Sequence, residues 1–465
     1  MKRLVPFLLI ISFVLSMFTG CVKQPPLEPI PVVQPKRLSV ADFTVDDAFA
    51  VVDKFYTYGT HFNVEGTLDV TNYFTAEALP DTEFELCIKY NDKEEDEIIL
   101  PLIVDKTDTE NVIRFNSAEY INEGINLEEL LKKDYIASIK ATGISAVYYF
   151  TLAPSDEEAP GCQPIEYYTI TKKKKNNVIN IGFGTCDGKE EGTKVPFLAL
   201  NVSAVKELPE DVYDIVIDPG HGGHDPGAMS NDGSFDERKL NLKNAMFLKT
   251  KLEDLGFKVY MTRTSDKETE EDTVHNVYDD DGKITKAMET KAKIYLAIHM
   301  NSSGTANSYS GFEIYIAPRD SLRFARSFSK EIAKATGKNA STLNQFKIED
   351  GVYSRGFKTA DYQELVNAAA RDGFKVYENV TENTPYYYFI REVGGIVTGA
   401  YTDGRNKLYS ANKYRNTNQG IESYLFELSY INNDEDLDFV LKNGDKFAIG
   451  ITNGLINYLY PETKK

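Results

Sequence analysis

From residue 211 onward, apolar strand-like runs alternate with helix-forming segments. The run "YDIVID" precedes the helical pattern "ERKLNLKNAMFLKTKLEDLG", and "KIYLAIHMNSS", "GFEIYIAP" and "SYLFELSYINN" are further strands in the same alternation. This pattern predicts an α/β domain over residues 211–461, with a mixed, largely parallel sheet covered by helices on both faces. Residues 342–384 fit no simple repeat and are interpreted as an insertion.

Residues 41–205 have a different pattern, as expected for a chain of 465 residues, which is too long for one ordinary domain. Short β-branched and aromatic runs such as "HFNVEGTLDV", "EFELCIKY" and "AVYYFTL" are bounded by Gly, Asn, Asp and Pro. They predict an all-β, sandwich-like domain. Its one histidine, His61, is interpreted as an ordinary strand or loop residue. Most of its aromatic rings should be core, and a few exposed rings would suit a module that binds the substrate or a protein partner.

The N-terminus is typical of an export signal. Residues 1–20 combine a basic start, an apolar stretch of about a dozen residues and an end of small residues. The apolar stretch is shorter than the roughly 20 residues that a membrane-spanning helix needs. The ending "FTGC" resembles a bacterial lipoprotein box, with Cys21 as the lipidated residue. Simple cleavage beside an incidental cysteine is the alternative. Residues 21–40 are rich in proline and would form a semi-rigid, lipid-anchored linker.

The net charge restricts the possible binding partners, and the number of cysteines restricts the possible disulfides. A formal net charge of −19 argues against nucleic acid, and the lysine run at residues 172–175 is interpreted as a solvated hairpin end. Export makes disulfides possible. If Cys21 is lipidated, Cys87, Cys162 and Cys186 remain, so one must stay unpaired; Cys162 and Cys186 could pair.

Four residues of the α/β region have the types needed for metal-assisted catalysis. His221 follows the first strand, Glu237 opens the next helix, His299 ends a buried strand, and Glu427 lies in an apolar strand. Two imidazoles and one carboxylate form a common catalytic zinc set with one coordination position open, and a second carboxylate could act as a base. Each residue alone is also compatible with an ordinary loop, helix-end or core role.

These stretches resemble the zinc-dependent N-acetylmuramoyl-L-alanine amidases of the cell-wall hydrolase type, over about residues 211–461. The first motif of that family matches "IVIDPGHGGHDPGA", which implies that His221 is a zinc ligand. The helix-opening glutamate and the second histidine strand match Glu237 and His299. The terminal motif matches "FELSYINN", which implies that Glu427 is the catalytic glutamate.

Other residues have weaker assignments. Asp218 and Asp225 could orient His221, and His224 is interpreted as a loop or substrate-side residue rather than a ligand. Asn301 and Arg391 are candidates for substrate binding. This sequence departs from the family in two places. The segment "EDTVHNVYDDDGKITKAMETKA" lacks the usual arginine-containing helix, and the region before Glu427 is longer. We therefore expect its substrate specificity to differ from that of the family.

The resemblance implies hydrolysis of the amide between N-acetylmuramate and L-Ala of the peptidoglycan stem peptide. Zinc would activate water and polarise the carbonyl, and Glu427 would transfer a proton to the departing amine. An exported protein, anchored by lipid to the membrane and facing the wall, would meet that substrate. Two alternatives stay open: a non-catalytic wall-binding regulator, and a zinc hydrolase of the same fold acting on another exported amide.

Overall fold

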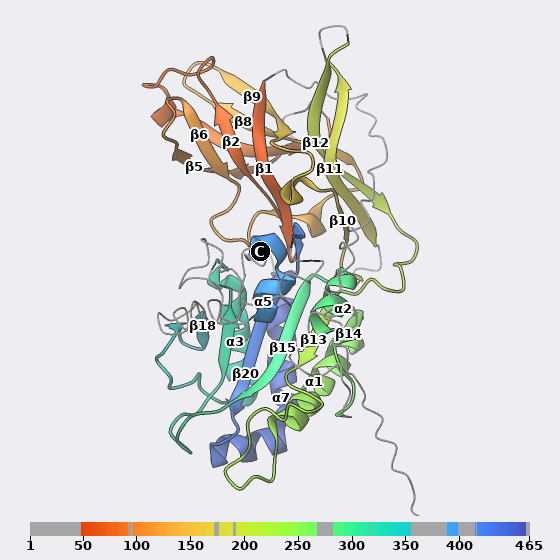
Figure 1. Cartoon of the computed structure of the whole chain (residues 1–465), viewed down its shortest axis with the longest axis vertical. Helices are drawn as coiled ribbons and strands as arrows, with labels where there is room; N and C mark the ends of the chain where they lie inside the picture. The colour runs from red at the N-terminus through yellow and green to blue at the C-terminus, as the bar shows by residue number, and fades with distance from the viewer. Residues whose placement is uncertain are drawn as a thin grey trace, which may run out of the picture.

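A computed structural model describes residues 48–91, 93, 96–171, 176–188, 192–266, 282–317, 319–354, 388–398, 414 and 416–461 (Figure 1). The expected export signal (1–20), Cys21, the linker (21–40) and the lysine run (172–175) lie outside these residues, as does the part of the expected insertion from 355 to 384. No helix in the described ranges has both the length and the apolar character needed to cross a bilayer.

The C-terminal part is built on a sheet of seven strands, in the order β14-β13-β15-β20-β16-β18-β17. The central neighbours β14, β13, β15 and β20 all run parallel, while β16 is antiparallel to β20. The predicted mixed, largely parallel sheet is therefore confirmed. Its strands are β13 (Ile215–Pro219), β14 (Val259–Met261), β15 (Ile294–Asn301), β16 (Glu313–Ile316), β17 (Lys347–Glu349), β18 (Val352–Ser354) and β20 (Glu422–Tyr430).

Helices cover both faces of this sheet, as expected for strands that are mainly apolar on both sides. Along β15, Leu296 and Ile298 belong to one core cluster while Tyr295 and Ala297 belong to another on the opposite face. The first face is covered by α1 (Glu237–Asp254), α3 (Leu322–Thr336) and α7 (Asp434–Leu459), and the second by α2 (Lys283–Glu289), α5 (Tyr388–Val393) and the short 3-10 helix at Gly395–Val397.

One element differs from the expectation for residues 342–384. In its described portion, β17 and β18 add two strands to the edge of the sheet beyond β16. Each has three residues, and such short runs carry too little periodicity to be recognised as strands in a sequence.

The N-terminal part is strand-rich, as predicted, but its strands belong to one 13-stranded hydrogen-bonded sheet, whereas a sandwich has two separate sheets packed face to face. The strand pairs form a closed ring. β4 pairs with β3 and β5 pairs with β6, and β4 continues into β5 with only Leu102 between them. Following the pairs from β8 through β3, β4, β5, β6, β2, β1 and β9 leads back to β8. The strands are β1 (Phe49–Tyr58), β2 (His61–Asp69), β3 (Glu83–Lys89), β4 (Ile98–Pro101), β5 (Ile103–Lys106), β6 (Val112–Asn116), β7 (Ile125–Asn126), β8 (Asp134–Thr142), β9 (Val147–Pro154), β10 (Ile165–Tyr168), β11 (Asn177–Asp187) and β12 (Lys194–Ala204).

The two parts share a core where β1 meets the α/β sheet. The end of β1 pairs in parallel with β19 (Gln419–Gly420), which leads directly into β20. Fully buried Tyr56 and Tyr58 from β1 pack in one apolar cluster with side chains of α2, α5 and the sheet. The β-rich part therefore covers the amino-terminal edge of the seven-stranded sheet, on the side away from the strand carboxyl ends (Figure 1).

A buried polar group completes this junction. Glu422, the first residue of β20, accepts hydrogen bonds from the Asn122 side chain (3.1 Å) and from the hydroxyls of Tyr424 (2.5 Å) and Tyr458 (3.2 Å). Burial raises the pKa of Glu422 to about 7, because these hydrogen bonds only partly offset the loss of water. Gly59, with φ of +62°, lies against the Glu422 side chain and leaves no room for a Cβ atom.

The described cysteines carry no disulfide. Cys162 forms no disulfide, so the pairing of Cys162 with Cys186 considered from the sequence does not form. Cys162 is buried, with its sulfur 3.5 Å from the carbonyl oxygen of Val52, whereas Cys186 lies on β11 beside β12.

Candidate metal centre

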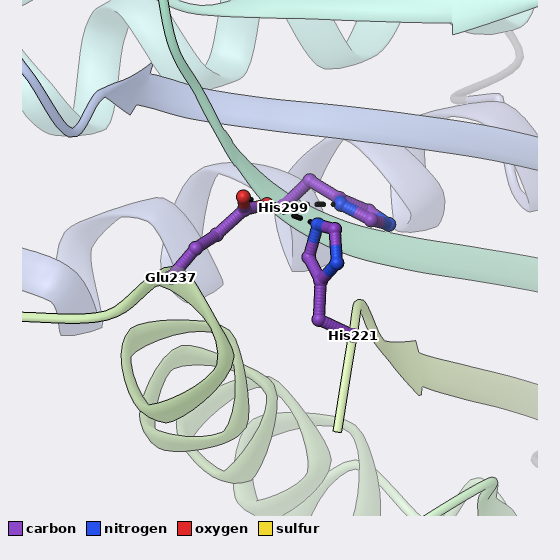
Figure 2. A group of neighbouring side chains, drawn as sticks. All are labelled: His221, Glu237 and His299. Atoms are coloured by element: carbon purple, nitrogen blue, oxygen red, sulfur yellow. Dashed lines mark hydrogen bonds and ion pairs between the residues drawn. The ribbon is translucent and has the colours of Figure 1, made fainter. Parts of the chain in front are cut away.

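The three expected ligands meet at the carboxyl edge of the sheet. His221 follows β13, His299 lies near the end of β15, and Glu237 is the first residue of α1 (Figure 2). Parallel neighbouring strands end at the same edge, and this is the usual location of sites in α/β folds. Each of the three side chains offers a ligand atom within 4.8 Å of the others, and no other such group of His, Cys, Asp or Glu occurs in the described part of the chain.

Glu237 lies between the two imidazoles. Its Oε2 is 3.1 Å from His221 Nε2 and its Oε1 is 3.0 Å from His299 Nδ1 (Figure 2). Backbone N–H groups of Ala228 and Met300 and the amide of Asn241 also donate to this carboxylate, at 3.0, 3.1 and 3.2 Å. Glu237 is thus held rigidly in a buried position.

The electrostatics of the group favour a cation. Burial acts against the charged imidazole of His221, but hydrogen bonds and charges from Glu237 and Asp225 outweigh it and raise the pKa of His221 to about 9. Burial likewise acts against the Glu237 carboxylate, yet the two histidines hold its pKa well below the ordinary range. A proton on His221 balances the local negative charge, and a divalent cation bound by two nitrogens and one oxygen would fit the same position.

The glycines of the loop after β13 are required by this crowded geometry. At Gly220, a Cβ atom would overlap the imidazole ring of His299. At Gly227, with φ of +65°, a Cβ atom would contact both His221 and Glu237. His221 itself has φ of +61°, a conformation that non-glycine residues adopt at an energetic cost and that is often found at functional sites.

The two aspartates expected to orient His221 have different partners. The Asp225 Oδ2 atom is 2.7 Å from His221 Nδ1, so it contacts the ring nitrogen that faces away from Glu237. Asp218 accepts a hydrogen bond from the Thr262 hydroxyl and pairs with Lys283 at 3.1 Å. Lys283 in turn donates to the His221 carbonyl oxygen at 3.2 Å, so Asp218 contacts the loop backbone through that lysine. His224 is exposed and lies outside the ligand group.

Glu427 stands beside the ligand group on β20. It is in register with His299 on the parallel strand β15 and with Glu313 on the antiparallel strand β16. The side chain is 9% exposed, and its Oε2 atom has no hydrogen-bond partner among the described residues. Burial, followed by the charges of Glu237 and Glu313, raises the pKa of Glu427 well above its ordinary value.

The two candidates for substrate binding are only partly described. Asn301 donates its side-chain amide to Glu313 (2.9 Å), and its Oδ1 accepts from the Ser302 N–H (2.7 Å), so both ends of the amide have partners within the protein. Arg391 lies in α5, and its side chain is outside the described atoms.

Sequence reasoning missed two charged residues at the site. Arg263, which is 7% exposed, donates to the carbonyl oxygens of Pro219 and Gly220 at 3.0 Å each, and so holds the backbone before His221. Glu313 is completely buried next to Glu427. Its signal was available, because "GFEIYIAP" places a carboxylate in an apolar strand just as "YLFELSYI" does.

Comparison with known proteins identifies similarity over the α/β part. A family model described as N-acetylmuramoyl-L-alanine amidase matches residues 215–457. A sporulation-specific N-acetylmuramoyl-L-alanine amidase of Bacillus subtilis is 33% identical over 158 residues, which is 33% of this chain and 51% of that protein. The amidase AmiC of Neisseria meningitidis is 30% identical over 169 residues, which is 36% of each chain. The match thus spans about half the length of the first relative and about a third of the second.

Among solved structures, the CwlD amidase of Clostridioides difficile in complex with the GerS lipoprotein is similar at 21% identity. The match covers 53% of this chain and 98% of that one, with a TM-score of 0.34. The catalytic domain of CwlV, an N-acetylmuramoyl-L-alanine amidase from Bacillus (Paenibacillus) polymyxa, is 22% identical over 53% of this chain and 98% of that one, with a TM-score of 0.33.

Proposed function

Because the chain belongs to the N-acetylmuramoyl-L-alanine amidase family, we propose that it hydrolyses the amide between N-acetylmuramate and L-Ala of the peptidoglycan stem peptide. The observation that carries this proposal is the convergence of His221, Glu237 and His299, with Glu427 in register beside them. Two imidazoles, one carboxylate and a second carboxylate, whose Oε2 has no partner among the described residues, are side chains suited to metal-assisted amide hydrolysis.

We propose zinc as the metal, with His221, Glu237 and His299 as its ligands. The donor set supports this choice, since two nitrogens and one oxygen suit zinc and leave a coordination position open. When bound, zinc would polarise the amide carbonyl and make water a stronger nucleophile. The protein's own contribution is to hold the ligands: Asp225 contacts His221, and the N–H groups of Ala228 and Met300 hold Glu237.

Glu427 is the proposed general base and acid. Its Oε2 has no partner among the described residues, so it is available to accept the proton of the attacking water. The same carboxyl group would then protonate the departing L-Ala nitrogen, which breaks the C–N bond and leaves the lactyl carboxylate.

We further propose that the protein is exported and anchored at the membrane through Cys21, facing the wall. The support is the sequence of residues 1–40 together with the wall-directed amidase family. The β-rich region, residues 41–205, would position the amidase part, residues 211–461, at its substrate and could dock a protein partner. A Cys21→Ser variant should leave the membrane fraction or retain its signal, and unchanged processing and fractionation would rule out the anchor.

Digestion of purified sacculi tests the proposed reaction. The protein without residues 1–35, loaded with zinc, should release stem peptides with a free L-Ala amine and leave a new lactyl carboxylate on the glycan, detected by mass spectrometry. Chelation should stop the release and added zinc should restore it. Zinc binding without product would favour the wall-binding regulator, and cleavage of a different exported amide would favour another hydrolase of this fold.

A further inference from the structure

Glu313 is a buried carboxylate with three hydrogen-bond donors directed at it. Its Oε2 accepts from the side-chain amide of Asn301 (2.9 Å) and from the hydroxyl of Tyr315 (2.8 Å), and its Oε1 accepts from the hydroxyl of Tyr430. Removing a carboxylate from water is costly unless such donors compensate. An apolar residue could fill the same strand position at lower cost, so this position needs a further explanation.

Two of the three donors come from the two strands that carry the proposed active site. Asn301 is two residues beyond His299 on β15, and Tyr430 is three residues beyond Glu427 on β20. His299 pairs with Glu427 and Asn301 pairs with Tyr430, so β20 contains one extra residue between these two pairs. This is a β-bulge, which bends a strand and redirects nearby side chains, and such bulges are frequent beside active sites.

Glu313 contacts both residues of the first pair beyond that bulge, Asn301 and Tyr430. One carboxylate oxygen holds Asn301 on β15, and the other holds Tyr430 on β20. The third donor, Tyr315, lies on β16 with Glu313, so this hydrogen bond stays within one strand. The carboxylate therefore ties β15 to β20 on the side of the bulge opposite His299 and Glu427.

We propose that Glu313 is a positioning residue that locks this bulge and thereby sets the placement of Glu427 relative to His299. The inference rests on the proposed function, in which His299 holds the metal and Glu427 transfers the proton. Proton transfer and attack depend steeply on placement, since a displacement of about 1 Å can lower a rate on the order of 100-fold. Neither Asn301 nor Tyr430 needs to touch substrate for this role.

Four conservative variants test the proposal in the zinc-loaded protein. Glu313→Gln keeps the shape but removes the charge and replaces one acceptor oxygen by an N–H donor, so a strand link there survives only as a weaker neutral hydrogen bond in which the partner accepts. Tyr430→Phe removes the link to β20 alone. Tyr315→Phe is the matched control, because it removes a donor from the same carboxylate without breaking the link between β15 and β20. Tyr430 also contacts Ser341 at 3.1 Å, so Ser341→Ala accompanies the Tyr430 variant.

Two readouts separate positioning from general stability. In Glu313→Gln and Tyr430→Phe, kcat on sacculi should fall about tenfold or more with KM and zinc content little changed, while Tyr315→Phe and Ser341→Ala stay within about twofold of the wild type. Amide hydrogen exchange in residues 426–432 should accelerate in the first two variants only. Exchange needs no turnover, so it still tests the lock if the wild-type protein fails to cleave peptidoglycan and the proposed reaction is wrong. Equal kcat and equal exchange in Tyr430→Phe and Tyr315→Phe would overturn the inference, even if Glu313→Gln does not fold.

Discussion

Glu427 stands directly opposite His299 on the neighbouring parallel strand. Adjacent strands lie about 4.8 Å apart, so this register alone brings a proposed proton carrier beside a proposed metal ligand. Both residues belong to neighbouring inner strands of a sheet that is covered on both faces. Their relative position is therefore set by strand pairing rather than by loops.

Replacing Glu427 by Gln should separate metal binding from catalysis. The Gln side chain preserves shape but cannot take a proton, so turnover should fall about 100- to 10,000-fold while zinc content stays at the wild-type level. Product release from sacculi and metal analysis of the same sample measure the two effects. Near wild-type turnover would mean that another group carries the proton.

The ligand histidines should behave in the opposite way. His221→Ala and His299→Ala each remove one of three ligands, so both variants should lose stoichiometric zinc after dialysis. His224→Ala is the matched control, since His224 lies three residues from His221 but outside the ligand group, and it should retain zinc. Equal zinc content in all three variants would place the metal elsewhere.

Gly220 is predicted to be irreplaceable for steric reasons. Gly220→Ala would drive a methyl group into the ring of His299, so zinc binding and activity should both be lost. Gly304, in the loop that follows β15, has open space around its Cα, and Gly304→Ala should bind zinc normally. A Gly220→Ala protein with wild-type zinc affinity would show that the His299 ring can shift at little cost.

Glu422 should make stability depend on pH at the junction of the two parts. Its pKa is about 7 in the folded protein, against an unfolded value of 4.5, so the folded state binds the extra proton. Stability from this group is fully present below pH 4.5 and is lost as pH rises to about 7, by about 3 kcal/mol. Glu422→Gln should flatten this slope, and melting temperatures of both proteins between pH 4.5 and 7.5 measure the difference. Parallel curves for the two proteins would contradict the assignment.

The α/β part should need the β-rich part for stability. A chain that begins at residue 206 would lose Tyr56 and Tyr58, two fully buried rings of the shared core, and large cavities of this kind cost about 3–5 kcal/mol each. It should melt well below the longer protein or aggregate, as scanning calorimetry would detect. Identical melting temperatures would show that each part folds independently.

The sheet of the α/β part was predictable from sequence because its main strands are short, mainly apolar runs that alternate with helix-forming segments. β15 buries Leu296 on one face and Tyr295 on the other, as expected for a strand with helices on both sides. The convergence of His221 and His299 also followed, because parallel strands end at one edge. Glu313 was missed since its importance depends on a pairing with Glu427 that spans more than 100 residues of sequence.

In the β-rich part, the strands were predictable from the sequence but their pairing was not. The ring of strands closes at Leu102, where β4, paired with β3, continues into β5, paired with β6. Pairings between distant strands depend on register, which local composition does not encode. The thiols of Cys162 and Cys186 illustrate the same limit, since only their positions in space exclude a disulfide.

The junction at the amino-terminal edge of the catalytic sheet has a geometric consequence. β1 runs towards this junction and β20 runs from it to the ligand group, so the start of β1 and the ligand group lie on opposite sides of the junction. A lipid anchor upstream of β1, as proposed, would connect to the protein through the β-rich part. The proposed linker at residues 21–40 and the β-rich part would then together set how far from the membrane the proposed site can reach.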